Sequence, residues 1–114
     1  MSKFAVIGSY SESSIAGLVQ SPSDRSVAAR EVIESLGGKL ESFYWMLGED
    51  DFIGIFDAPD DVTAAAVSVK VTSAGACRNV RTIRLLTMDE TQKLLQKAKS
   101  ATYHPPSAIP AGRG

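Results

Sequence analysis

Apolar and polar positions alternate in blocks along this chain, and four apolar blocks have the length and composition of β-strands. The first covers residues 3–9, and residues 78–86 alternate two sets of side chains in the manner of a strand. Residues 41–47 and 52–57 are rich in aromatic and β-branched side chains and meet at the acidic turn Gly48–Asp51. The pair predicts a β-hairpin whose glycine supplies the positive φ of a tight reversal.

Three helices are predicted from spacing and end signals, at residues 22–36, 61–72 and 88–99. Ser21 is the expected N-cap of the first helix, Asp60 that of the second, and Thr87–Glu90 reads as a capping box for the third. Gly37–Gly38 is expected to end the first helix. Residues 11–21 are more polar and predict about one helical turn.

This βαββαβ order with one added C-terminal helix predicts an α+β, ferredoxin-like fold with a four-stranded antiparallel sheet, similar to the dimeric α+β-barrel proteins. Residues 1–100 are expected to form one domain. Residues 101–114, rich in proline and glycine, are expected to form a flexible tail.

Both faces of the hairpin are apolar, which predicts association. The two crossover helices of this fold lie on one face of the sheet, so the other face exposes an apolar set of side chains. Strict alternation predicts one of two sets: Phe43, Trp45, Leu47, Ile53 and Ile55, or Leu40, Tyr44, Met46, Phe52 and Phe56. We therefore expect a homodimer formed sheet against sheet, or a larger homo-oligomer.

Composition narrows the class of protein further. The chain has 114 residues and a formal net charge of −1, so a broad basic surface for nucleic acid or an anionic membrane is not expected. The single cysteine, Cys77, excludes an intrachain disulfide. The apolar start of the chain is too short for a signal peptide, and no run approaches the length of a membrane span. These features predict a cytoplasmic protein.

The stretch Gly38–Phe52, followed by Ala58–Asp61, resembles the signature of the GYD-domain family. The resemblance spans about residues 3–95 and also includes Pro22, Arg25, residues 36–38 and residues 79–82. Gly48 and Asp51 match the glycine and aspartate that give the family its name, whereas Asp50 stands where the tyrosine is usual. The resemblance implies a ferredoxin-like fold and sheet-to-sheet dimers but no particular reaction.

Five side chains are candidates for contact with a ligand: Tyr44, Trp45, Asp51, Arg81 and Arg84. Tyr44 and Trp45 point to opposite faces of one strand, so one of them can line a pocket, although core packing is the commoner fate. Arg81 and Arg84 also lie on opposite faces, and each can clamp an anion or pair with a carboxylate such as Asp51 or Asp57.

No catalytic or metal-binding constellation is visible. The consecutive acids of residues 49–51 point in different directions on a tight turn and favour a solvated turn over a cation site. His104 lies in the predicted tail without a second metal ligand, and Cys77 has no base near it in sequence, which favours a packing role. No phosphate loop or dinucleotide fingerprint is present, so we expect no cofactor.

Two functions remain open from the sequence. The first is an oligomeric module that binds a small ligand or a partner without covalent chemistry. The second is a cofactor-free enzyme, of the oxygenase or isomerase type found among dimeric α+β-barrel proteins. An enzyme requires a pocket between helices and sheet that contains an ionisable residue with a perturbed pKa.

Overall fold

The computed structural model describes residues 1–107 of the chain. The elements, in chain order, are β1 (Ser2–Tyr10), α1 (Glu12–Gln20), α2 (Arg25–Ser35), β2 (Lys39–Trp45), β3 (Phe52–Ala58), α3 (Asp61–Ser73), β4 (Cys77–Leu85) and α4 (Met88–Lys99). The predicted βαββαβ order is confirmed, with α1 inserted before the first crossover helix and α4 added after the last strand.

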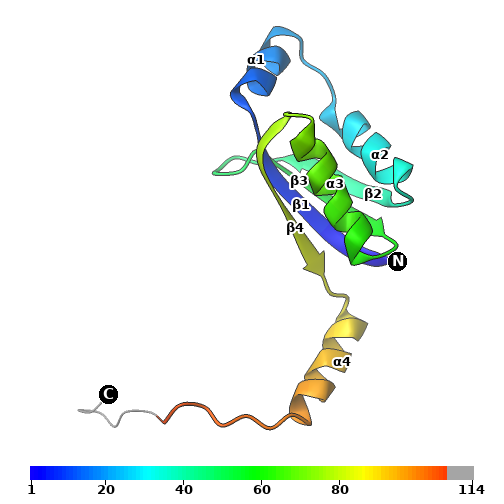
Figure 1. Ribbon diagram of the computed structural model, residues 1–114, viewed down its shortest axis with the longest axis vertical. Helices are drawn as coiled ribbons and strands as arrows, with labels where there is room; N and C mark the ends of the chain where they lie inside the picture. The colour runs from blue at the N-terminus through cyan, green and yellow to red at the C-terminus, as the bar shows by residue number, and fades with distance from the viewer. Residues whose placement is uncertain (108–114) are drawn as a thin grey trace, which may run out of the picture.

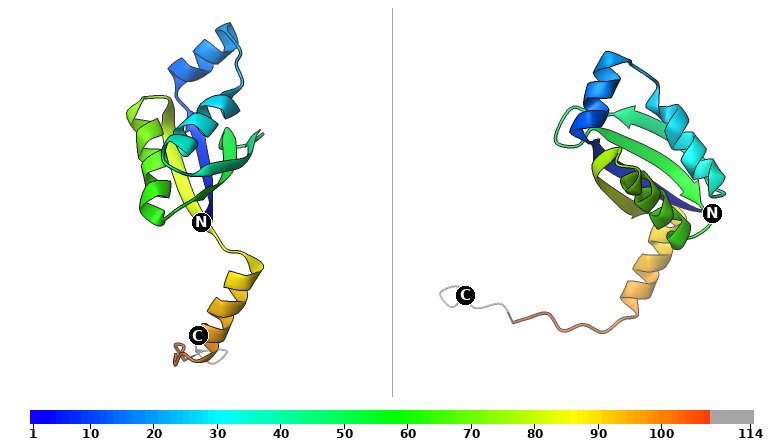
Figure 2. Two further views of the ribbon diagram at one scale, coloured as in Figure 1. Left: turned by 90° about the vertical axis from the view of Figure 1, so that its right-hand side faces the viewer. Right: turned by 45° about the horizontal axis from the view of Figure 1, so that its top comes forward.

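The four strands form one antiparallel sheet in the order β2-β3-β1-β4, which is that of the ferredoxin-like fold. The crossover helices α2 and α3 lie on the same face of this sheet, as Figures 1 and 2 show. Within residues 1–107, no helix covers the opposite face.

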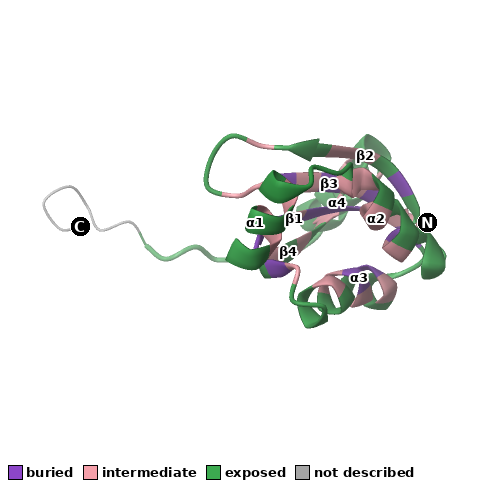
Figure 3. Ribbon diagram, turned by 90° about the horizontal axis from the view of Figure 1, so that it is seen from above, coloured by how far each residue is buried: buried purple, intermediate pink, exposed green. Residues whose placement is uncertain are grey.

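The hydrophobic core lies between the sheet and the two crossover helices. Its larger members are Phe4, Val6, Tyr10, Ile33, Leu40, Phe52, Phe56 and Val67. Phe56 is completely buried and stacks on Phe4, with ring centroids 5.7 Å apart. Figure 3 shows buried positions on the strands and on α2 and α3. The core is therefore one-sided, and it holds the crossover helices to the sheet.

Two helix starts differ from the sequence prediction. The segment after β1 is a complete helix of nine residues, because Ser11 accepts a hydrogen bond from the backbone N–H of Ser14 and caps its start. Helix α2 begins at Arg25 and not at Pro22. The prediction of Ser21 as its N-cap is wrong, because Ser21 is the C-cap of α1. Asp24 is the N-cap of α2, since its carboxylate accepts a hydrogen bond from the backbone N–H of Ser26 at 2.9 Å. Pro22 instead lies in the connection between α1 and α2.

The predicted alternation of the hairpin is wrong because β2 contains a bulge. Leu40 pairs with Phe56, but the next pair joins Ser42 to Ile55, which leaves Glu41 without a partner. The extra residue reverses the alternation within β2. The side chains facing the helices are Leu40, Phe43, Trp45, Phe52 and Phe56, whereas Tyr44 shares the other face with Ile53 and Ile55. Neither predicted set is therefore correct.

The connection between β2 and β3 uses glycine as predicted. Gly48 has a φ of 149°, in the region that favours glycine. The turn is tied to the sheet by two backbone hydrogen bonds, from Met46 N–H to the Asp51 carbonyl at 2.8 Å and from Asp51 N–H to the Gly8 carbonyl at 2.9 Å. The acidic turn is thus anchored beside the end of β1.

The C-terminal helix α4 extends away from the rest of the molecule (Figure 1). The predicted capping box is confirmed, because the side chains of Thr87 and Glu90 each accept a hydrogen bond from the backbone N–H of the other residue. Glu90 also binds Arg84 at 2.6 Å, which fixes the junction with β4. No residue of α4 is buried. Residues 101–107 contain no helix or strand, and the rest of the predicted tail, residues 108–114, lies outside the described residues.

The uncovered side of the sheet, here called the open face, carries an apolar centre between charged ends. Its members are Lys3, Ala5, Ile7, Tyr44, Ile53, Ile55, Asp57, Arg81, Ile83 and Leu85. Lys3 contacts Glu41 at 2.5 Å and Asp57 at 3.1 Å at one end. At the other end, Arg81 contacts Asp50 at 2.8 Å.

Candidate functional site

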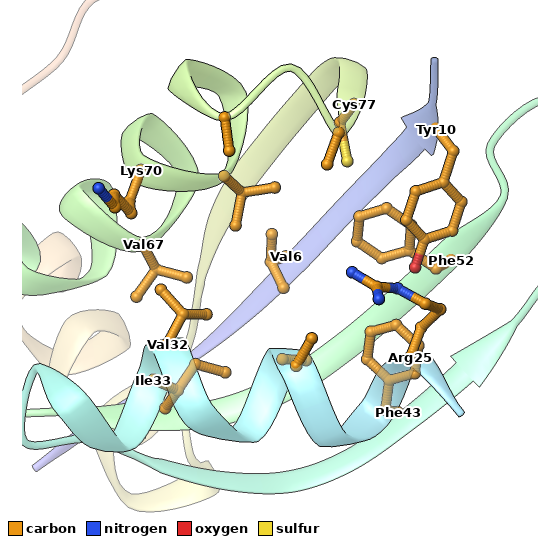
Figure 4. A pocket seen from close by; sticks show the side chains of 15 residues that line it. Val6, Tyr10, Arg25, Val32, Ile33, Phe43, Phe52, Val67, Lys70 and Cys77 are labelled. Atoms are coloured by element: carbon orange, nitrogen blue, oxygen red, sulfur yellow. The ribbon is translucent and has the colours of Figure 1, made fainter. Parts of the chain in front are cut away.

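A cavity of about 260 Å³ lies between α2, α3 and the sheet. Its floor is formed by Val6, Phe43 and Phe52 from three strands, and its walls by alanine and valine side chains of the two helices (Figure 4). Small wall residues leave this space open, because Ala28 and Ala29 of α2 do not reach across to α3. The sequence therefore builds an apolar cavity within its own core.

Polar groups gather where the cavity meets the first turn of α2. The Arg25 guanidinium lies beside the Tyr10 hydroxyl, with the Cys77 thiol nearby (Figure 4). Burial raises the pKa of the Tyr10 hydroxyl, although Arg25 acts in the opposite direction. Burial also raises the pKa of the Cys77 thiol, again against Arg25. Both groups are therefore neutral at pH 7, and the cation is Arg25.

A second, more polar hollow adjoins this end of the cavity. It lies beneath α1 and the connection to α2, and it shares Tyr10 and Arg25 with the apolar cavity. Its other lining residues include the serines Ser14, Ser21 and Ser23. Arg25 and Tyr10 thus stand at the boundary between an apolar space and a hydroxyl-lined one.

Tyr10 is held firmly at this boundary. Its ring lies 5.0 Å from that of Phe52 and 5.2 Å from that of Trp45, measured between centroids. Its backbone N–H donates to the Asp51 carboxylate at 2.9 Å. The strand register shifts between Ser9 and Tyr10, which brings Tyr10 to the helix side of the sheet. The acidic turn therefore helps to position the end of the cavity through the bond from Tyr10 to Asp51.

The five sequence-predicted ligand residues do not form one site. Tyr44 and Arg81 lie on the open face, and the side chain of Tyr44 is exposed. Trp45 and Asp51 support Tyr10 from outside the cavity lining. Arg84 lies over the Phe4 ring at 5.8 Å and pairs with Glu90. Both arginines pair within the chain, but with Asp50 and Glu90 in place of the suggested Asp51 or Asp57.

Sequence reasoning missed Arg25, Lys70 and Tyr10 as cavity residues. A signal was present for Arg25, because Ala29 and Val32 follow it at i+4 and i+7 on the apolar stripe of α2. A charged residue on an apolar stripe points toward the core. Cys77 was expected to be buried, and this is confirmed, but its place beside the cavity could not be seen from the sequence.

Residues 1–107 contain neither a metal-binding cluster nor a membrane-spanning helix. In this part of the chain, no group of three or more His, Cys, Asp or Glu side chains is placed to hold a metal ion. No helix within the same range has the length and apolar character needed to cross a membrane.

Comparison with known proteins gives a family and a fold. The family model described as GYD domain matches residues 4–95. The crystal structure of MtbAldR shares 17% sequence identity with a TM-score of 0.50, and the match covers 96% of this chain but 58% of MtbAldR. A mutant of CutA1 from Pyrococcus horikoshii OT3 is matched at 14% identity and a TM-score of 0.30, covering 83% of this chain and 96% of that one. No curated protein sequence matches.

Proposed function

We propose that this chain, which belongs to the GYD domain family, is a homo-oligomeric module that binds a small molecule in the cavity between α2, α3 and the sheet. The cavity carries the proposal. Its lining is almost wholly apolar, whereas protein interiors are normally filled to the density of an organic crystal. An apolar space of this size left unfilled by side chains favours an exogenous occupant.

The chemistry at the cavity supports binding without covalent catalysis. An enzyme of the cofactor-free type needs a group with a pKa suited to proton transfer or nucleophilic attack. The cavity does contain ionisable groups with perturbed pKa values, as the enzyme alternative requires, but burial raises the pKa of both Tyr10 and Cys77 and keeps them protonated. A protonated thiol is a poor nucleophile. The buried thiol is also consistent with the predicted cytoplasmic location.

The open face supports association of two copies. Its apolar centre includes Ile7, Ile53 and Ile55, and neither α4 nor another described helix covers it. Apolar surface of this kind drives association when a complementary face is available, and a two-fold axis makes a face complementary to itself. The ligand-binding role first assigned to Tyr44 and Arg81 becomes, in this proposal, a role in the contact between copies.

Benzene, a neutral probe, tests whether the cavity takes an apolar guest. It is titrated into ¹⁵N-labelled protein, and shifts are expected at the backbone amides of cavity residues such as Val32 and Val71. In Ala29→Phe the new ring occupies the cavity, so these shifts should vanish. In the control Ala65→Phe, which changes an exposed residue of α3, they should remain. Wild-type spectra without shifts at the cavity would refute the proposal.

A second measurement looks for the natural occupant. Protein purified from its own host is examined by native mass spectrometry, and a retained small molecule is expected on the wild-type chain. The same preparation of Ala29→Phe should give the mass of the protein alone.

A further inference from the structure

The cavity and the adjoining hollow lie side by side, share the lining residues Tyr10, Arg25 and Ala76, and differ in polarity. The apolar part lies over Phe43 and Phe52. The polar part is bordered by the hydroxyl-bearing residues Ser14, Ser21 and Ser23, and the two parts share Tyr10 and Arg25. A molecule that fills both parts needs an apolar body and one polar end. The position of Arg25 at the boundary indicates where that polar end lies.

Arg25 is a cation of the cavity lining, and it forms no salt bridge within the described residues, as is also true of Lys70. Lys3, Arg30, Arg81 and Arg84, by contrast, each form a salt bridge. Asp51 also acts on this end of the cavity, and its carboxylate accepts a hydrogen bond from the backbone N–H of Tyr10. Arg25 lowers the pKa of the Tyr10 hydroxyl and of the Cys77 thiol more than Asp51 raises it, so Arg25 is the stronger of these two charges at this end of the cavity.

From this arrangement we propose that the ligand is a small amphiphilic monoanion, a carboxylic acid with an apolar aromatic or branched body. Its carboxylate binds the Arg25 guanidinium and accepts a hydrogen bond from the Tyr10 hydroxyl, and its body fills the apolar cavity. The inference rests on the proposed function, because it names the class of ligand for the same cavity.

A carboxylate fits this site better than a phosphate. The guanidinium offers a planar fork that matches the two oxygens of a carboxylate, and the neutral Tyr10 hydroxyl adds one donor. A phosphate monoester carries a second negative charge. That charge would have no cationic partner beside Arg25 and would lie near Asp51, which opposes it. Lys70, the other cation of the lining, belongs to α3 and not to this end of the cavity.

The volume sets the size of the body. An apolar cavity of about 150 Å³ accepts benzene. The 260 Å³ found here accommodates a single ring with a short chain. A suitable probe is therefore 3-phenylpropionate, with 3-phenylpropanamide as its neutral partner of the same shape. The two probes have the same size and shape and differ only at the polar end, where a charged carboxylate that accepts hydrogen bonds replaces a neutral amide, so their comparison with and without the guanidinium reports the contribution of Arg25.

Both probes are titrated by calorimetry into the wild-type protein and two variants. Arg25→Met removes the guanidinium but keeps the length of the side chain. Arg30→Met is the matched control on the same helix, because Arg30 pairs with Glu34 and lines neither part of the site. Benzene binding to Arg25→Met, followed by the amide shifts described above, verifies that its cavity is intact.

Wild type and Arg30→Met should bind the carboxylate about 10- to 100-fold more tightly than the amide. In Arg25→Met this preference should disappear, while the affinity for the amide stays within about twofold. Arg25→Lys should keep part of the preference, because it retains the charge without the fork.

Three results would overturn the inference: equal affinities for the two probes in wild type, a preference that survives Arg25→Met, or binding of neither probe. If benzene still enters the wild-type cavity in those cases, the proposed binding function stands and the assigned ligand class fails. If benzene does not enter either, both fail together.

Discussion

Replacing Ile83 by lysine tests the proposed association most directly. Ile83 belongs to β4 and lies on the open face beside Ala5 of β1. Its side chain is 39% exposed in the single chain, so a lysine can place its ammonium in water without disturbing the core. In a sheet-to-sheet dimer the same position is covered by the partner, and two-fold symmetry makes each substitution count twice.

The expected effect follows from this exposure. Full burial of an isoleucine is worth about 1.5–3 kcal/mol, so the 39% still exposed leaves about 0.6–1.2 kcal/mol for each copy to gain on association. Losing this burial energy from both copies, before any other effect is counted, weakens the dimer by about tenfold or more. Each ammonium that is buried adds a desolvation cost of several kcal/mol, so the total loss reaches about a thousandfold or more.

Light scattering on the peak eluting from a size-exclusion column, at micromolar concentration, measures the outcome. The wild type should elute with the mass of a dimer and Ile83→Lys with the mass of a monomer, and circular dichroism should show that both are folded. Val69→Lys is the control, since Val69 is 67% exposed on α3 and lies away from the open face. A wild-type monomer, or a dimer unaffected by Ile83→Lys, would refute the reasoning.

Two further predictions concern stability. Gly48→Val should lower the free energy of unfolding by about 1–2 kcal/mol, because a β-branched residue is strained at a φ of 149°. A Cβ at this position meets no atom within 4 Å, so the backbone angle alone causes the penalty. The control Gly17→Ala, in an equally open helical position, should not destabilise the protein, and an unchanged melting temperature for Gly48→Val would contradict this account. The second concerns Glu90, whose pKa is lowered from 4.5 to about 2, first by Arg84 and then by the Thr87 backbone. A lowered carboxyl pKa stabilises the folded form above pH 4.5, and this contribution is lost as the pH falls through about 2. NMR shifts of the first turn of α4 should follow that window, and in Glu90→Gln the change near pH 2 should be absent.

The elements of this fold could be predicted from the sequence wherever a local signal has a local cause. The capping box at Thr87–Glu90 and the N-cap Asp60 fix helix starts through bonds between near neighbours in the chain. Gly37 and Gly38 end α2 in the same way, since their N–H groups donate to the Glu34 and Ile33 carbonyls.

The sequence could not show which face of β2 carries its aromatic residues. The bulge at Glu41 depends on how Leu40 and Ser42 pair with β3, and pairing between strands is a tertiary property. One unpaired residue moves every later side chain of the strand to the other face. For this reason Trp45 lies on the same face as Leu40 and Tyr44 lies on the opposite face, which is the reverse of what strict alternation predicts.

The sequence alone determined the βαββαβ order, the caps of α3 and α4, the glycine turn at Gly48 and the apolar surplus that predicts association, because each rests on neighbouring residues and on overall pattern. Tertiary structure decided the site. The cavity exists because α2 and α3 stand apart over Phe43 and Phe52, and Arg25 reaches its end because the first turn of α2 packs beside Tyr10. These residues lie far apart in the chain, and only the packing of helices on the sheet brings them together.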